Sequence, residues 1–178
     1  IGLFGRQLGV ENFGQLTAYT MAFMMLGYVL GLVLIPRVLS QAGALAASAF
    51  LGIFFTIAIV YADLTSTGIW MAALGWLDVP AIPNTVFFVA LLGLANALVW
   101  PAIWPLALRG LNEKQIGTGS ALLIMGIAGG AIMPVVFGAI SDVSADPRTA
   151  YWIMLPCYLF VVYYALLGHK LNNWAFRS

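Results

Sequence analysis

The stretch that decides the fold is residues 93–142, GLANALVWPAIWPLALRGLNEKQIGTGSALLIMGIAGGAIMPVVFGAISD. Its charged residues are confined to a short turn around Arg109 and Lys114 and to Asp142 at its end. Crossing the roughly 30 Å hydrocarbon core of a bilayer takes about 20 apolar residues, and the backbone there must satisfy its own hydrogen bonds. The stretch therefore predicts two transmembrane helices joined by a short charged turn.

The same pattern continues on both sides of this stretch in the chain of 178 residues, of which 63% are hydrophobic and 7% charged. Soluble domains carry about a quarter charged residues. The pattern predicts an all-α membrane protein with five transmembrane helices, at approximately 13–35, 43–62, 85–108, 116–140 and 150–168. Between the second and third spans, Ile69–Leu77 is too short to cross. It predicts an interfacial segment with Trp70 and Trp76 at headgroup level, or else a plain loop.

The polar residues exclude several function classes. A formal charge of +1 offers no basic surface for nucleic acid. Cys157 and His169 are the only residues of their types, so we expect no metal centre and no cofactor. No Asp, Glu or His lies within a predicted span, where an intramembrane enzyme would need a base or metal ligand, so we predict no enzyme. A channel is disfavoured because no ring of charges or filter-like loop is visible.

The basic residues predict the orientation in the membrane, because loops rich in Lys and Arg stay on the cytoplasmic side. Alternating spans place five basic residues on one side and two on the other: Arg37, Arg109, Lys114, Lys170 and Arg177 against Arg6 and Arg148. The amino end is therefore expected outside and the carboxy end in the cytoplasm. Because the chain begins with Ile1 and not Met, we interpret it as a fragment that at least one further span precedes.

Small residues spaced four apart give the first and fourth spans a similar face. The first span has Gly27 and Gly31, and the fourth has Gly126, Gly130 and Pro134. This spacing stacks residues on one side of a helix and lets another helix approach closely. Pairing span one with four and two with five gives a 3+3 inverted repeat, as in each half of a major facilitator transporter. The alternative is that glycine is simply common in membrane helices.

Several motifs of the deciding stretch occur together: Asn96, Trp100-Pro101, Trp104-Pro105, Gly119-Ser120 and the run Gly126, Gly129, Gly130, Pro134. With them the stretch resembles the carboxy-terminal half of the fucose:proton symporter family, sugar permeases of the major facilitator superfamily that include glucose/galactose carriers. Residues 2–37 also look like the seventh loop and eighth span of those permeases.

The resemblance implies that the chain is spans eight to twelve of the carboxy-terminal six-helix domain of a transporter in the bacterial inner membrane. The amino-terminal half and the seventh span would then be missing. A sugar is the implied substrate and a proton or sodium ion the implied coupling ion, while the family's coupling carboxylates match no residue here.

The candidate site is Asn96, Trp100 and Trp104, which climb one face of the third span with a drift of about 40° per step. A sugar presents hydroxyls on its edge and C–H groups on its face, which suits an amide and a flat indole. Pro101 and Pro105 remove backbone donors and predict a kinked, cavity-lining helix. The alternative is that Trp104 belongs to the cytoplasmic aromatic belt and Asn96 merely bridges two helices.

These features together predict a fragment of a hexose or fucose permease that works by ion-coupled symport and alternating access. A carrier explains the glycine faces, the broken third span and the aromatic–amide face at once. The alternative is a structural or assembly subunit of a membrane complex, because a glycine-rich bundle with few polar groups in its spans needs only partners.

Overall fold

The structure is a computed structural model that describes residues 4–5, 8–10, 13–35 and 37–171. It is 78% helical, and no strand occurs within the described residues. The predicted all-α fold is confirmed. Arg6 and Arg177, two of the charges used for the orientation, lie outside the described residues.

Five helices or helix pairs are long and apolar enough to cross a membrane, so the chain is a multi-pass membrane protein. They are α2 (Phe13–Leu34), α3 (Gln41–Tyr61), α5 and α6 (Asn84–Ala97 and Val99–Ala107), α7 and α8 (Glu113–Gly126 and Gly129–Val143), and α9 (Met154–Leu166) with its short flanking turns η2 (Thr149–Ile153) and η3 (Gly168–Lys170). The fourth span extends beyond the predicted 116–140 at both ends.

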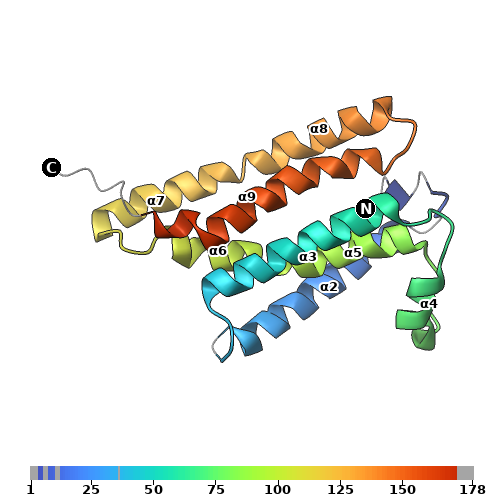
Figure 1. The fold of residues 1–178 in the computed structure, drawn as a ribbon, viewed down its shortest axis with the longest axis horizontal. Coiled ribbons are helices and arrows are strands. Elements are labelled where there is room, and N and C mark those ends of the chain that lie inside the picture. The colour runs from blue at the N-terminus through green and yellow to red at the C-terminus, as the bar shows by residue number, and fades with distance from the viewer. Residues whose placement is uncertain (1–3, 6–7, 11–12, 36, 172–178) are drawn as a thin grey trace.

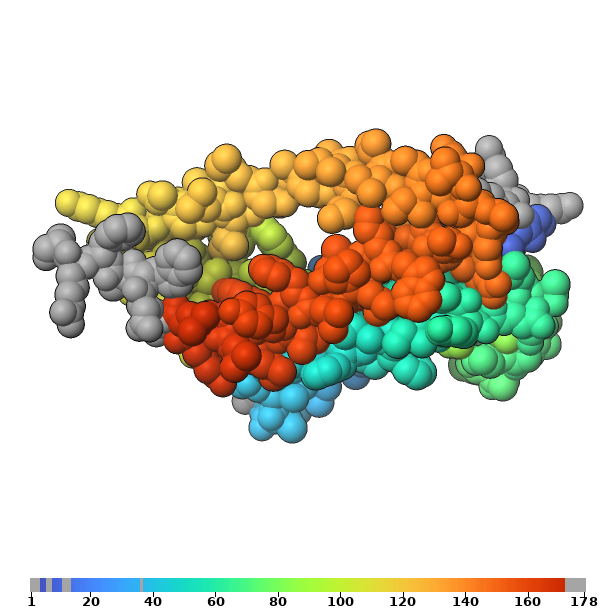
Figure 2. All heavy atoms as spheres, turned by 45° about the horizontal axis from the view of Figure 1, so that its top comes forward, coloured from blue at the N-terminus to red at the C-terminus, as the bar shows by residue number. Residues whose placement is uncertain are grey.

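Helices α3 and α5 form the centre of the bundle (Figure 1). Helix α2 packs along α5, and α9 packs along α3. The α7–α8 pair runs along the outside, beside α9, and meets the rest of the bundle mainly at η2 (Figure 1). Figure 2 shows an open gap between α7–α8, in yellow and orange, and α9, in red. The fourth span is therefore the least packed of the five, and no residue of its apolar window is buried.

Glycines allow α2 and α5 to cross closely. A Cβ placed on Gly27 would lie 2.6 Å from the Cβ of Ala97 and 3.0 Å from the carbonyl oxygen of Leu94. A Cβ on Gly93 would overlap the carbonyl oxygen of Thr20. Since backbone atoms cannot move aside as side chains can, hydrogen is the only substituent that fits at Gly93.

The segment between the second and third spans folds into α4 (Gly68–Leu74) and the short turn η1 (Gly75–Leu77). The side-chain oxygen of Asn84, at the start of α5, accepts hydrogen bonds from the amides of Ile69 and Trp70 and so caps α4. The placement of Trp70 at headgroup level stays a prediction, because burial within the protein does not fix depth in a membrane. The side chain of Trp70 is fully buried, with its ring edge-on to Tyr19 and Phe87. Trp76 is 77% exposed, as an interfacial residue would be.

Arg148 joins the loop after α8 to the end of α3. Its guanidinium forms an ion pair with Asp146, accepted by both carboxylate oxygens, and donates to the carbonyl oxygen of Ala62 at 2.7 Å. The hydrogen bond from Arg148 lowers the pKa of the Asp146 carboxyl below its usual value. Among the described residues this is the one ion pair, and it anchors an otherwise loosely packed span.

We predict that Gly93→Ala lowers the stability of the protein by about 1–3 kcal/mol, because the added methyl group overpacks the crossing of α2 and α5. Thermal unfolding in detergent measures the change. Gly14→Ala is the matched control, since no atom outside the local helix lies within 4 Å of its would-be Cβ. Equal stability of the two variants would contradict the close crossing.

We also predict that Arg148→Gln lowers the unfolding temperature near neutral pH. Because the folded-state pKa of Asp146 is lowered, the ion pair stabilises the fold above the ordinary carboxyl pKa and loses its effect as the pH falls through the lowered pKa. The difference between wild type and variant should therefore shrink between about pH 7 and about pH 3. Arg37→Gln, at an exposed arginine, is the control. A pH-independent difference would refute the assigned cause.

Candidate functional site

The third span is interrupted where the sequence predicts it. Helix α5 ends at Ala97 and α6 begins at Val99, with Leu98 between them outside regular helix. Pro101 lies in the first turn of α6, where amides lack intrahelical acceptors, so a proline costs little there. Pro105 lies inside α6. Broken helices expose backbone groups that a cavity or a packed neighbour must satisfy.

Asn96 lies at the last turn of α5 and connects two helices. Its side-chain oxygen accepts a hydrogen bond of 3.0 Å from the hydroxyl of Tyr158 on α9. The ring of Tyr158 fills the space beside Gly52 on α3, where a Cβ would overlap it, and is only 4% exposed. Helices α3, α5 and α9 therefore meet at one tyrosine side chain.

The amide nitrogen of Asn96 donates no hydrogen bond to any described residue, and Asn96 is half-buried. Because Tyr158 occupies the amide oxygen, the two N–H donors stay available and their direction is fixed. Tyr158 was not among the predicted site residues. It is one of three tyrosines on α9, so the sequence does not single it out, and its partner is 62 positions away.

The two predicted tryptophans lie together on α6. Their ring centroids are 5.5 Å apart, with the ring planes inclined by 55°. Trp100 is 44% exposed and Trp104 is partly buried. The structure thus pairs the two indoles with each other and Asn96 with Tyr158, all around the break in the third span.

The five predicted packing residues have two different environments. Gly27 and Gly31 face the third span, where a Cβ on Gly31 would overlap the side chain of Leu98. At Gly126 and Gly130, a Cβ would meet nothing within 4 Å among the described residues, and Pro134 is exposed. A packing role for the fourth-span residues therefore stays a prediction.

The fourth span contains a second break that was not predicted. Helix α7 ends at Gly126 and α8 begins at Gly129. The amides of Ile127, Ala128, Gly130 and Ala131 donate to carbonyls three residues earlier, which is the tighter 3₁₀ pattern. Pro134 lacks the N–H that an α-helix would aim at the carbonyl of Gly130. Adjacent glycines followed by a proline are the signal in the sequence that could have revealed this break.

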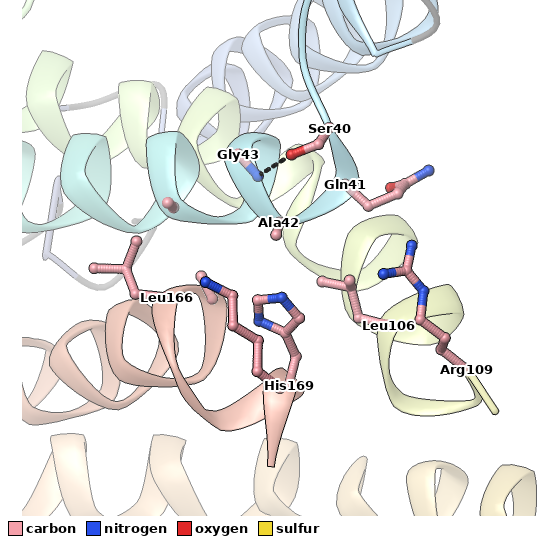
Figure 3. A pocket seen from close by; sticks show the side chains of 11 residues that line it. Ser40, Gln41, Ala42, Gly43, Leu106, Arg109, Leu166 and His169 are labelled. Atoms are coloured by element: carbon pink, nitrogen blue, oxygen red, sulfur yellow. Dashed lines mark hydrogen bonds between the residues drawn. The ribbon is translucent and has the colours of Figure 1, made fainter. Parts of the chain in front are cut away.

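Two surface pockets lie away from these residues. One, of about 420 Å³, lies between the amino-terminal end of α2 and residues 80–83. The other, of about 350 Å³, lies at the start of α3 (Figure 3). No group of three His, Cys, Asp or Glu side chains that could hold a metal ion occurs in the described part of the chain.

Part of the chain is similar to curated transporters. It is 37% identical over 79 residues, 44% of the chain, to a protein of Brucella abortus named glucose/galactose transporter. It is 30% identical over 89 residues to a putative glucose/galactose transporter of Helicobacter pylori and 41% identical over 68 residues to the L-fucose-proton symporter of Haemophilus influenzae. The relatives carry sugar-transporter names.

The matched segments cover only 16% to 22% of these relatives, and 36% to 48% of this chain. The chain therefore spans a minor part of the transporters to which it is similar. No family model matches the chain, and no solved structure matches it.

We predict that Tyr158→Phe and Asn96→Ala are strongly non-additive. Each single change removes the same hydrogen bond between α5 and α9, which is worth about 0.5–1.5 kcal/mol. Once one partner is changed, the second change has little left to remove. Thermal unfolding of both single variants and the double variant measures the coupling. Tyr163→Phe is the control, since Tyr163 is 48% exposed on the same helix. Additive losses would show that the bond contributes nothing.

Proposed function

We propose that the chain is part of a sugar transporter, in the carboxy-terminal six-helix domain of a major facilitator protein. The observation that carries the proposal is the similarity of up to 48% of the chain to curated sugar transporters, in a five-span bundle whose third span is broken beside an amide and two indoles. A purely structural subunit would need neither the free amide donors nor the exposed indole.

In this proposal Asn96 and Trp100 contact a hexose or fucose. The N–H groups of Asn96 donate to ring hydroxyls, while Tyr158 holds the amide in position from the other side. The indole of Trp100 stacks on the C–H face of the sugar, and Trp104 supports that ring. A sugar hydroxyl can both donate and accept a hydrogen bond. An amide held in one position offers it only N–H donors, so the amide fixes how the hydroxyl must point.

Transport in this proposal occurs by alternating access, coupled to a proton or sodium ion. The amino-terminal half of the transporter would close the sugar cavity against the open side of the bundle. Breaks in the third and fourth spans supply the points at which helix segments tilt separately. The Asp, Glu, Lys, Arg and His side chains of the described residues lie at or near the ends of the spans, so we place the coupling carboxylate in another part of the transporter.

We further propose that the protein lies in a bacterial inner membrane with the α2–α3 and α6–α7 loops in the cytoplasm. Arg37, Arg109 and Lys114 lie in or beside these loops, and the turn after α9 at the same end carries Lys170. Moving this end outside would reverse the usual distribution of positive charge.

We predict that Asn96→Ala weakens sugar binding by about five- to hundredfold, since an amide bonded to buried hydroxyls contributes roughly 1–3 kcal/mol. Trp100→Phe keeps a stacking face without the N–H donor, so its affinity should fall between wild type and Trp100→Ala. Uptake of labelled glucose, galactose and L-fucose into proteoliposomes of the full-length protein, with a binding titration in detergent, measures both effects.

Trp104 and Trp152 serve as controls in the same titration. Trp104→Phe should alter affinity less than Trp100→Phe, because Trp104 lies one turn further along α6 and is less exposed. Trp152→Phe, in η2, should leave affinity unchanged. Well-folded Asn96→Ala and Trp100→Ala proteins with wild-type affinity would refute the site, and absence of uptake of all three sugars would refute the function.

We predict for the orientation that single cysteines at Ser40 and Asn112 resist a membrane-impermeant thiol reagent in intact cells, whereas one at Thr67 reacts. Each cysteine is introduced into a Cys157→Ser background, because Cys157 is an exposed thiol. Labelling after permeabilisation shows that the two protected positions are reactive. The reverse pattern would overturn the proposed orientation.

A further inference from the structure

The pocket at the start of α3 gathers basic side chains from two parts of the chain. Its wall includes Arg109, which follows α6, and His169 and Lys170, which belong to η3. In Figure 3 the guanidinium of Arg109 and the imidazole of His169 extend toward the first turn of α3 from two sides. None of the described residues that line this pocket of about 350 Å³ is acidic.

The first turn of α3 adds backbone donors to these side chains. The amide of Gly43 donates to the side-chain oxygen of Ser40, while the amides of Gln41 and Ala42 donate to no described residue. Helix α3 is 21 residues long, so its start also carries the positive end of a long helix dipole. Backbone amides and a dipole of this sign attract anions.

Two further details leave polar groups available in the pocket. The ring Nδ1 of His169 lies 3.1 Å from the carbonyl oxygen of Tyr164 and must donate to it, because a carbonyl only accepts. The other ring nitrogen, Nε2, has no hydrogen-bond partner among the described residues. The amide oxygen of Gln41 is buried with no hydrogen-bond partner among the described residues, and a half-turn of that amide would place an N–H donor there instead.

We propose that this pocket binds a phosphate group. A phosphate carries enough negative charge to offset several cations, and its oxygens accept from a guanidinium fork, an ammonium and helix amides together. The volume of about 350 Å³ admits a phosphate with part of the group attached to it. The phosphate comes either from a phospholipid headgroup at the membrane surface or from a soluble phosphate compound, and the two sources share the same contacts.

The test uses the full-length protein in a maltoside detergent, which itself has no phosphate. In one arm, inorganic phosphate is titrated by calorimetry against sodium chloride of equal ionic strength. In the other, native mass spectrometry compares retention of phosphatidylglycerol with that of diacylglycerol, which lacks the phosphate. Binding in the first arm identifies a soluble phosphate, and binding in the second arm alone identifies a lipid headgroup.

The decisive variant is Arg109→Gln with Lys170→Gln, which should weaken phosphate binding at least about tenfold. The matched control is Arg37→Gln with Lys114→Gln, which removes the same charges from exposed residues outside the pocket and should change affinity less than about twofold. Equal losses in both double variants would show only general surface attraction and would overturn the site. Wild-type protein that binds in neither arm would overturn it too.

Gln41→Glu keeps the test valid if the double variant folds poorly. A carboxylate at the start of a helix favours folding, so this variant should be as stable as wild type. Its negative charge would pair with the pocket cations and repel phosphate, and affinity should fall at least about tenfold. Unchanged phosphate binding by folded Gln41→Glu protein would refute the proposal.

Discussion

A bilayer offers no hydrogen-bond partners to the peptide backbone, so every N–H and C=O within it must bond inside the protein. Helices α2 and α3 meet this demand without interruption, but the third and fourth spans do not. The break at Leu98 is packed against Gly31 of α2. The break near Ile127 has no such cover among the described residues, since Ile127 is 57% exposed, but its amides find carbonyl partners three residues earlier.

Polar side chains within the spans also need hydrogen-bond partners inside the protein, and they find them either in their own helix or in another one. The hydroxyls of Thr20 and Thr56 donate to carbonyls one turn earlier in their own helices, so they are satisfied locally and add no binding capacity. Asn96 instead accepts from another helix and retains free donors. Because Asn96 is only half-buried, those donors are not closed off from its surroundings.

The spans and the break at Leu98 were predictable because their signals are local: the length of an uncharged run and the position of a proline. The partner of Asn96 was not, because its contact with Tyr158 depends on how α5 and α9 pack across α3. The full burial of Trp70 was not predictable either, because tryptophan is typical of membrane interfaces. The side-chain oxygen of Asn84 accepts hydrogen bonds from two amides of α4, which orients α4 and places this indole in the bundle.

The two ends of the bundle differ in how their charges are balanced. At one end, hydrogen bonds from Thr65 lower the pKa of Asp63, and Asp146 pairs with Arg148, so the carboxylates have partners within the protein. At the other end, Arg109 and Lys170 form no ion pair with a described residue. Anionic headgroups or soluble anions can supply the missing negative charge there. The same imbalance from which the positive-inside rule predicts the orientation of the chain thus leaves the cations of the pocket without a carboxylate partner among the described residues.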